Sequence, residues 1–334
     1  MQDIRKAACI GGGVIGAGWV ARLLLNGIDV ALFDPAPDAA RKVEEVMAGA
    51  RRAYGAMTDT LPAEGRLTLA ASIEDAVKEA DFIQESVPER LDLKHKVLAE
   101  IDARARPDAL IGSSTSGLKP TDMQAPMTHP ERLVVAHPFN PVYLLPLVEI
   151  VAGEKTDPAM VEKARNVYAA IGMKPVVIRK EIEAFVGDRL LEALWREALW
   201  LIKDGVTTVE ELDDIIRYSF GLRWAQMGLF QTYRIAGGEA GMRHFMAQFG
   251  PCLEWPWTKL TDVPELTDEL VDTIATQSDE QAAGLSIREL ETIRDDNLVA
   301  IMRALAASQG GKGWGAGEAL NSYAKQLKDR AGIR

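Results

Sequence analysis

Short apolar runs alternate with stretches of helical periodicity through the first half of the chain. Apolar runs of about four to seven residues, bounded by turn-forming residues, are typical of strands that are buried on both faces. Strands that alternate with helices in this way predict a parallel, doubly wound α/β sheet. The predicted strands are 7–10, 29–33, 81–87, 109–113, 133–136, 147–151 and 175–178. The predicted helices begin at residue 14 and also cover 38–54, 75–80, 91–104 and 157–172.

The second half of the chain has almost no strand pattern after residue 182. We therefore predict two domains, a doubly wound cofactor domain over 1–182 and an all-α substrate and dimerisation domain over 183–334. The segment that begins at Ser308 is rich in glycine, and we expect it to be loosely held. The helical stretches of this half are 184–203, 209–218, a stretch that starts near 266, and 286–307.

A glycine-rich turn joins the first predicted strand to the first predicted helix. Its sequence, GGGVIG, fits the pattern G-x-G-x-x-G, with Gly11, Gly13 and Gly16 at the key positions. Glycines at these positions permit a tight turn and let the backbone approach a pyrophosphate. The pyrophosphate then rests on amide groups at the helix N-terminus, at Val14 and Ile15. This context predicts a Rossmann-type dinucleotide site; the alternative is a glycine-rich turn that binds nothing.

An acidic residue, Asp34, ends the second predicted strand, about 20 residues after the turn, as the dinucleotide fingerprint requires. A carboxylate accepts hydrogen bonds from a ribose 2′-hydroxyl and repels a 2′-phosphate. The residues that follow, Pro35, Ala36 and Pro37, include no arginine that could reverse this preference. The sequence therefore predicts NAD, and not NADP, as the cofactor.

The composition narrows the partners and the compartment. A formal charge of −11 argues against nucleic acid and anionic membranes as partners, and no apolar run is long enough to span a bilayer. Cys9 lies in the first predicted strand and Cys252 far from it in sequence, so we expect neither a disulfide framework nor a metal site. Because the first strand begins close to residue 1, we expect no signal peptide and a cytoplasmic location.

His137 and Glu149 form the first candidate for chemistry. His137 directly follows the apolar run 133–136, at a strand end, where doubly wound sheets place their ligands. Glu149 lies inside the apolar run 147–151, and a buried carboxylate needs a cationic or donating partner. A histidine beside it would gain a fixed tautomer and could act as the general base that deprotonates an alcohol. The alternative makes His137 a strand-end cap and pairs Glu149 with a lysine at the domain rim.

Hydroxyl groups gather after the strand predicted at 109–113. The sequence SSTSG covers 113–117, and Ser116 within it is available to hydrogen-bond a substrate oxygen. Taken alone, such a cluster of serine and threonine is more often just a turn.

The motifs GGGVIG, ESVPERLDLK, SSTSGL, HPFNPVYLLPLVEIV and FVGDRLL together resemble the 3-hydroxyacyl-CoA dehydrogenase family, in the same order and spacing. The resemblance covers most of the chain. It implies that Ser116, His137 and Glu149 act together on the hydroxyl group of the substrate, and that Asn140 lies in the active site.

The same resemblance implies how the cofactor is bound and how the protein assembles. Glu89 and Lys94 correspond to residues that contact the nicotinamide ribose in this family. A homodimer that forms through the α-helical domain is also implied.

The chain departs from this family in two places. Members that act on acyl-CoA carry a long, lysine-rich helical arm, whereas 47–69 is short here and offers only Arg51, Arg52 and Arg66 to the phosphates of CoA. In FVGDRLL, Asp188 stands where those members have asparagine. An additional negative charge suits a cationic substrate better than an anionic thioester.

Aromatic faces next to a carboxylate are what a quaternary ammonium group needs. Six of the seven tryptophans fall in the second predicted domain, at positions 195, 200, 224, 255, 257 and 314. We expect most of these rings to belong to the core or to a dimer interface, and Trp195 and Trp224, together with Asp188, to bind the ammonium group of a small substrate. The stretch that begins at Gly221 resembles a branch of the family that acts on such a molecule, a 3-hydroxy acid with a trimethylammonium group.

Two other functions stay open. The chain could be a dehydrogenase of another 3-hydroxy acid, such as L-gulonate, 3-hydroxybutyrate or 3-hydroxyacyl-CoA. It could also be a non-catalytic NAD-binding protein, like the lens crystallins of this family. The joint presence of Ser116, His137 and Glu149 speaks against a purely structural protein, which would not require the set.

Overall fold

The computed structural model describes residues 4–225, 228–236, 241–249, 258–259, 265 and 267–332. Cys252, Trp255 and Trp257 lie outside these described residues.

The chain forms two compact units. The first consists of Met1–Asp188 and Thr292–Arg334, and the second of Arg189–Glu291. The first unit thus takes up both ends of the sequence. The functional division into 1–182 and 183–334 stays a prediction.

An eight-stranded sheet forms the centre of the first unit. Its strands are β1 Lys6–Ile10, β2 Asp29–Phe33, β3 Leu67–Leu69, β4 Phe82–Glu85, β5 Leu110–Ser113, β6 Leu133–Pro138, β7 Leu147–Ala152 and β8 Lys174–Ile178. They lie in the order β3-β2-β1-β4-β5-β6-β7-β8. The six strands from β3 to β6 run parallel, which confirms the predicted doubly wound fold.

The last two strands of the sheet run in the opposite direction, which differs from the predicted parallel sheet. β7 pairs antiparallel with β6, and β8 pairs parallel with β7. A parallel neighbour requires a long crossover, usually a helix, whereas antiparallel strands can be joined by a short connection. Only residues 139–146, which contain no helix, join β6 to β7.

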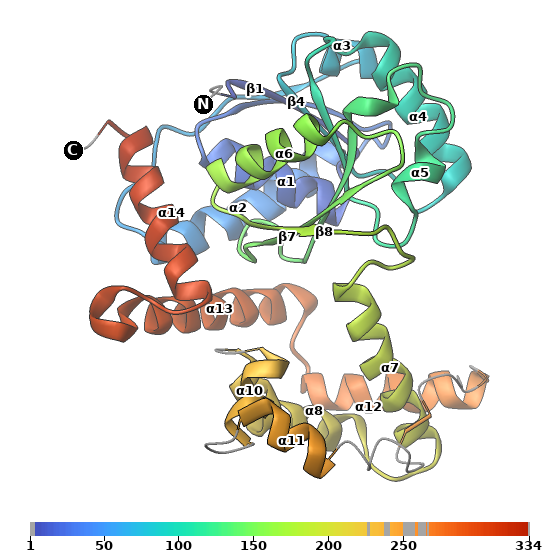
Figure 1. Cartoon of the computed structure of the whole chain (residues 1–334), viewed down its shortest axis with the longest axis vertical. Helices are drawn as coiled ribbons and strands as arrows, with labels where there is room; N and C mark the ends of the chain where they lie inside the picture. Colours follow the sequence, from blue (N-terminus) through green and yellow to red (C-terminus); the bar gives the residue numbers. More distant parts are fainter. Residues whose placement is uncertain are drawn as a thin grey trace. The chain divides into compact units, whose positions relative to one another are not determined.

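Helices cover both faces of this sheet (Figure 1). They are α1 Val14–Leu25, α2 Ala39–Met57, α3 Ile73–Val77, α4 Leu91–Arg104, α5 Pro120–Met123 and α6 Pro158–Ala170, with a 3₁₀ turn at Pro130–Arg132. Successive side chains of a strand point to opposite faces. Accordingly, Ala7 and Cys9 of β1 pack with α1, α2 and α6, whereas Ala8 and Ile10 pack with α3, α4 and α5. Burial on both faces is why the strands appear in the sequence as continuous apolar runs.

The C-terminal segment from Thr292 onward belongs to the first unit and forms most of α13 Ile287–Gly311 and all of α14 Ala316–Arg330. Leu320, Tyr323 and Leu327 of α14 are buried in the same core as α1 and α2. The prediction of a loosely held segment after Ser308 is therefore wrong. The glycines there separate two helices, and the second helix completes the core.

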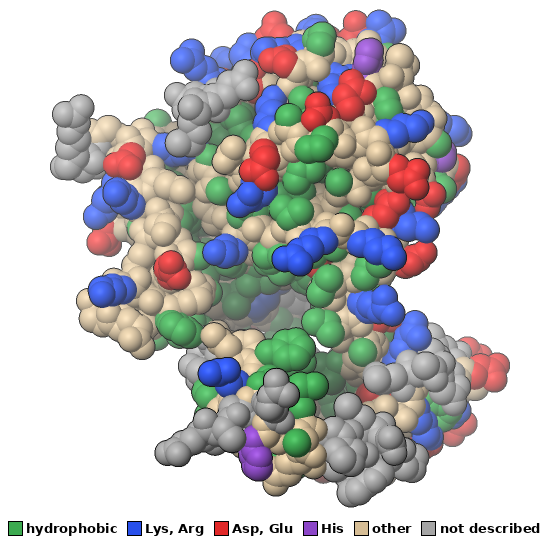
Figure 2. All heavy atoms as spheres, viewed as in Figure 1, with side chains coloured by type: hydrophobic (Ala, Val, Ile, Leu, Met, Phe, Trp, Pro, Cys, Tyr) green, Lys and Arg blue, Asp and Glu red, His purple; other side chains and the backbone are tan. Residues whose placement is uncertain are grey.

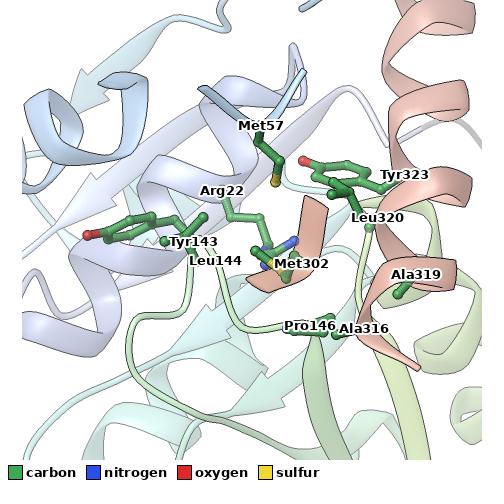
Figure 3. Close-up of a pocket in the computed structure, with 11 residues that line it drawn as sticks. Arg22, Met57, Tyr143, Leu144, Pro146, Met302, Ala316, Ala319, Leu320 and Tyr323 are labelled. Atoms are coloured by element: carbon green, nitrogen blue, oxygen red, sulfur yellow. The ribbon is translucent and has the colours of Figure 1, made fainter. Parts of the chain in front are cut away.

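Arg22 of α1 is a buried cation that binds three separate stretches of backbone. Its Nε donates to the carbonyl oxygen of Val142 at 2.8 Å, Nη1 to that of Ile171 at 2.9 Å, and Nη2 to that of Leu145 at 3.2 Å. Figure 3 shows it in a small pocket that Met302 of α13 also lines. Each of the three guanidinium nitrogens thus donates to a carbonyl oxygen, as buried polar groups generally do.

The described residues of the second unit form helices. These are α7 Gly187–Lys203, whose first two residues belong to the first unit, α8 Val209–Tyr218, α9 Phe220–Trp224, α10 Leu229–Ala236, α11 Gly241–Phe249 and α12 Asp268–Ala282. The helix predicted over 209–218 is confirmed, and the one predicted over 184–203 begins at Gly187.

Large apolar side chains are exposed in this unit, and Figure 2 shows hydrophobic side chains at its surface. On α7, Leu190 is 63% exposed and Leu191 55% exposed, while Leu199 and Ile202 of the same helix are buried. Helix α7 therefore has apolar residues on more than the side that packs within the unit. Within the described residues, no helix is both long enough and apolar enough to cross a lipid bilayer.

Candidate active site

The glycine-rich turn lies between β1 and α1, as the sequence predicts. Gly11 has a φ of +99°, and a Cβ at this position would lie 2.6 Å from the carbonyl oxygen of Ser86. A Cβ on Gly16 would lie 1.9 Å from the carbonyl oxygen of Gly11. At Gly13, by contrast, a Cβ would meet no atom within 4 Å, and the next residue, Val14, is 65% exposed. The turn is thus tightly packed on its inner side and open at the N-terminus of α1, where a pyrophosphate fits.

Asp34 follows β2 and faces this turn. Its Oδ2 accepts a hydrogen bond from the backbone N–H of Gly12 at 2.5 Å, and its Oδ1 accepts one from Ala36 at 2.7 Å. A carboxylate oxygen has lone pairs for more than one donor. Asp34 can therefore bind this backbone and still accept hydrogen bonds from a ribose.

His137 and Glu149 meet across the antiparallel pair of β6 and β7, where they occupy directly opposite positions. Opposite residues of such a pair point to the same face, with Cβ atoms about 5 Å apart. His137 Nδ1 lies 2.9 Å from Glu149 Oε2, and both side chains are 4% exposed. The sequence left open whether Glu149 pairs with this histidine or with a lysine. The structure pairs it with His137.

The second oxygen of Glu149 is held by the start of α7. Its Oε1 accepts hydrogen bonds from the backbone N–H groups of Val186 at 3.2 Å and Gly187 at 3.0 Å. A helix N-terminus favours a negative charge, so the carboxylate is stabilised as an anion. Ala184 and Phe185, which precede these amides, have φ of 58° and 48°. Such left-handed conformations cost on the order of 1–3 kcal/mol each in non-glycine residues, and they cluster at functional sites.

Asp188 brings a second carboxylate to the imidazole. Its Oδ2 lies 3.5 Å from His137 Nε2, and its side chain is 27% exposed. The sequence predicts Asp188 in an ammonium pocket; the contact with His137 is an additional feature of the structure. Among the residues that the structure describes, no group of three or more His, Cys, Asp or Glu side chains is arranged to hold a metal ion.

Ser116 lies in a loop that Glu89 organises. Glu89 Oε1 accepts hydrogen bonds from the Thr115 hydroxyl, from the backbone N–H of Ser116 at 3.1 Å, and from that of Gly117 at 2.9 Å. Burial works to raise the pKa of Glu89, but these hydrogen bonds and the charge of Lys94 hold the pKa below its usual value. The Ser116 hydroxyl is on an exposed residue whose backbone is fixed.

Lys94 is buried beneath this loop. Its Nζ donates to Glu85 Oε1 at 2.8 Å and to the carbonyl oxygen of Val87 at 3.1 Å, and it lies 3.7 Å from Glu89 Oε2. Lys94 and Glu85 are 1% and 0% exposed. Glu85 is not among the predicted site residues, although an acid at the end of the apolar run DFIQE carries the same signal as Glu149.

The other predicted site residues are exposed. Asn140 is exposed in the connection between β6 and β7. Within the described residues, neither Ser116 nor Asn140 hydrogen-bonds to His137. Trp195 and Trp224 belong to the second unit, where they are 53% and 41% exposed.

Two family models match the chain. The model described as "3-hydroxyacyl-CoA dehydrogenase, NAD binding domain" matches residues 6–182. The model described as "3-hydroxyacyl-CoA dehydrogenase, C-terminal domain" matches residues 185–273.

Curated relatives are similar over almost the whole chain. The "L-carnitine dehydrogenase" of Mesorhizobium japonicum is 76% identical over 98% of this chain and 90% of the relative. The "L-carnitine dehydrogenase/betainyl-CoA thioesterase" of Rhizobium meliloti is 67% identical over 99% of this chain and 67% of the relative. The "L-carnitine dehydrogenase" of Pseudomonas putida is 54% identical over 94% of this chain and 98% of the relative.

Solved structures show the same fold. A 5-formyl-3-hydroxy-2-methylpyridine 4-carboxylic acid 5-dehydrogenase, described as an NAD⁺-dependent dismutase, is 30% identical, with a TM-score of 0.77 over 91% of this chain and 99% of that chain. The (S)-3-hydroxybutyryl-CoA dehydrogenase of Ralstonia eutropha is 22% identical, with a TM-score of 0.56 over 84% of this chain and 95% of that chain. The second likeness concerns the fold alone.

Proposed function

This chain belongs to the 3-hydroxyacyl-CoA dehydrogenase family, and from that premise we propose that it oxidises the 3-hydroxyl group of L-carnitine to give 3-dehydrocarnitine. The observation that carries this proposal is the buried pair of His137 and Glu149, with Nδ1 and Oε2 at 2.9 Å. The substrate is supported by the 76% identity to a protein named L-carnitine dehydrogenase.

NAD is the cofactor of this chain, and when bound it supplies the hydride acceptor of the reaction. We assign the pyrophosphate to the turn of Gly11, Gly13 and Gly16, with the amide groups of Val14 and Ile15 as donors. The open space at Gly13 supports this assignment, because a side chain there would fill the approach to the helix N-terminus.

Asp34 would accept hydrogen bonds from the adenosine ribose, on the grounds of its position between the glycine turn and the end of β2. Glu89 and Lys94 stay predictions for the nicotinamide ribose. Lys94 is buried against Glu85 and lies near Glu89, which binds the loop of Ser116. This supports an indirect contribution of Lys94 to ribose binding, through Glu89, more than a direct contact with the ribose.

His137 would act as the general base of the reaction. Glu149 would accept a hydrogen bond from the N–H at Nδ1, and the lone pair on Nε2 would then be available to take the hydroxyl proton. The carboxylate also stabilises the imidazolium ion that results. Ser116 and Asn140 would hydrogen-bond the reacting oxygen and so orient the alcohol toward Nε2; both lie in exposed loops at strand ends.

The charge of the site supports a small cationic substrate over acyl-CoA. In the segment that could grip CoA, Arg51 pairs with Glu64, with Nη2 and Oε1 at 2.8 Å, and Arg66 pairs with Asp29 at 3.3 Å. These cations are thus already neutralised by carboxylates. Asp188 would in turn attract the trimethylammonium group.

Trp195 and Trp224 stay predicted contacts of that group, on the general preference of quaternary ammonium ions for aromatic faces.

A homodimer and a cytoplasmic location complete the proposal. The exposed leucines of α7, Leu190 and Leu191, support a second copy as the partner of the helical unit. Cys9, a buried free thiol, supports a reducing compartment.

The test is NADH absorbance with purified protein and NAD⁺, measured with L-carnitine and, in parallel, with D-carnitine, L-3-hydroxybutyrate and L-gulonate. We expect NADH to form with L-carnitine alone. Activity on another acid, without activity on L-carnitine, would be consistent with His137 as the base but would refute L-carnitine as the substrate. Binding of NAD without turnover of any alcohol would instead favour a crystallin-like protein.

A further inference from the structure

The two carboxylates that flank His137 are held in different ways. Glu149 is 4% exposed and is fixed by two backbone N–H groups of the α7 start. Asp188 is 27% exposed and faces the other ring nitrogen, with Oδ2 and Nε2 at 3.5 Å. Glu149 thus belongs to the scaffold, whereas Asp188 stands where solvent and a substrate can reach it.

The position of Asp188 is unfavourable for a neutral base. When the Nδ1–H group donates a hydrogen bond to Glu149, the neutral imidazole directs the lone pair of Nε2 toward the Asp188 carboxylate, and two acceptors face each other. Protonation of Nε2 gives His137 a positive charge and an N–H group that points at Asp188, which replaces the repulsion by attraction. Asp188 therefore favours the protonated imidazole, which cannot accept the proton of an alcohol.

A substrate with its own positive charge relieves this conflict. In L-carnitine, the ammonium nitrogen is two bonds from the carbon that bears the hydroxyl group. When that hydroxyl contacts Nε2, the ammonium group comes within reach of a carboxylate that already lies beside Nε2.

We propose that Asp188 exchanges counter-ions: it stabilises protonated His137 in the free enzyme and binds the substrate ammonium group in the complex. On binding, the Nε2 proton is released to water and leaves a neutral base. The hydroxyl proton then passes to Nε2, and the hydride passes from the same carbon to the nicotinamide, so the C–O single bond becomes a carbonyl. This inference rests on the function proposed above, and it makes a cationic substrate the condition for an active base.

The other charges near this site have different partners. Glu181 accepts a hydrogen bond from the backbone N–H of Thr121 at 3.1 Å, and Glu183 pairs with Lys119 at 3.2 Å. The rings of Phe139 and Phe185 pack against the imidazole, with centroid distances of 4.9 and 5.6 Å. Among the described residues, the charged groups that contact the imidazole of His137 are Glu149 and Asp188.

The first experiment uses the unmodified protein and two substrates of the same shape. One is L-carnitine; the other is its carbon isostere with the same spatial arrangement, in which a tert-butyl group replaces the trimethylammonium group. For each, kcat/KM is measured against pH, together with the single-turnover rate of NADH formation at saturation. The former reports protonation in the free enzyme and the latter in the complex, and the single turnover avoids masking by product release.

With L-carnitine, we expect the midpoint of the acid limb to lie roughly one pH unit lower in the complex than in the free enzyme. The reason is that the ammonium group of the substrate neutralises Asp188, which then no longer stabilises protonated His137. With the isostere, the two midpoints should coincide. An equal downward shift with the uncharged isostere would overturn the proposal, and so would the absence of a shift with L-carnitine.

The second experiment removes the charge of Asp188. Asp188→Asn should lower the acid-limb midpoint of kcat/KM by roughly one pH unit. It should also reduce the preference for L-carnitine over the isostere by about tenfold. The matched control is Glu192→Gln on the same helix, whose carboxylate lies 3.7 Å from Arg196 and is 53% exposed; its profile should equal that of the unmodified protein.

The outcomes separate this inference from the proposed function. No NADH from L-carnitine at any pH would refute the function itself, whereas turnover with an unshifted midpoint would refute only the role of Asp188. If Asp188→Asn does not fold, as judged by NAD binding, the comparison of the two substrates on the unmodified protein still tests the exchange of counter-ions. A change in KM for L-carnitine without any change in the pH midpoint would reduce Asp188 to a simple binding group and overturn the exchange.

Discussion

The two compact units differ in how deeply their ion pairs are buried. In the first unit, Lys94 pairs with Glu85 and Arg132 with Asp102, and all four side chains are at most 2% exposed. In the described part of the second unit, the ion pairs lie at the surface. They include Lys259 with Asp204, Arg217 with Asp214, and Arg196 with Glu192, whose side chains are 41–56% exposed.

Apolar side chains show the same contrast. Leu327 of α14 is 0% exposed in the core of the first unit, whereas Leu191 of α7 is 55% exposed in the second. Buried ion pairs need fixed partners, so they hold loops and strand ends in one geometry. This contrast is consistent with the base proposed in the first unit and with the association proposed for the second.

The largest expected effect concerns the proposed base in the first unit, His137. His137→Ala should lower the rate of hydride transfer by about 10²–10⁴-fold, because the hydroxyl proton loses its acceptor. The affinity for NAD should stay the same, as measured by titration calorimetry. His129→Ala is the control, since its side chain is 61% exposed. Equal losses of turnover and of NAD affinity would indicate a structural role for His137.

A pair of matched leucines tests the contrast in packing. Leu327→Ala removes a buried side chain and should reduce the free energy of unfolding by about 2–5 kcal/mol. Leu191→Ala, at an exposed position, should change it by less than about 0.5 kcal/mol. Both are measured by urea denaturation at low protein concentration, where a dimer does not contribute. Similar losses in the two variants would contradict the contrast.

A pair of matched aspartates tests the contrast in electrostatics. Burial works to raise the pKa of Asp102, but hydrogen bonds from Arg132, His129 and Thr128 lower it below the usual value. The stability that the Asp102 charge contributes is therefore present above the ordinary carboxyl pKa of about 3.9 and is lost as the pH falls through the lowered pKa.

Asp102→Asn should thus reduce the free energy of unfolding at pH 7 by about 1.5–3 kcal/mol, and the difference from the unmodified protein should shrink in acid. Asp204→Asn, which removes an exposed pair, should change it by less than about 1 kcal/mol at any pH. Denaturation curves from pH 3 to 7 check both. A constant deficit for Asp102→Asn across this range would exclude the charge as its cause.

The smallest expected effect concerns association of the second unit. Leu191→Asp places a charge on the exposed apolar side of α7 and should raise the dissociation constant of a homodimer by about tenfold. Sedimentation velocity over a range of concentrations measures it. Turnover per folded chain, extrapolated to high concentration, should stay close to that of the unmodified protein. A monomer at all concentrations before mutation would remove the dimer from the proposal.

Local patterns were sufficient for much of the fold. The apolar run before His137 and the one around Glu149 predicted two buried strands, and the structure forms β6 and β7 there. The direction of β7 was not predictable from these runs, because an apolar run has the same pattern in either direction. The pairing of His137 with Glu149 depends on that direction, since the antiparallel register places them opposite each other.

Other features of the site depend on contacts that no local pattern encodes. The helix start that carries Asp188 is preceded by a left-handed turn at Ala184 and Phe185, neither of which is a glycine that would mark such a turn in the sequence. The burial of Lys94 depends on Glu85, nine residues earlier on a neighbouring element.

By itself, the sequence determined the elements whose physical cause is local. The glycine turn, the acid Asp34 after the next strand and the alternation of strands with helices follow from steric limits and from periodicity along the chain. The tertiary structure decided the rest: the reversal at β7, the return of α14 to the core, and the position of His137 between two carboxylates. These features join residues far apart in sequence, and their geometry is set by burial and by pairing of charges, which a one-dimensional pattern does not contain.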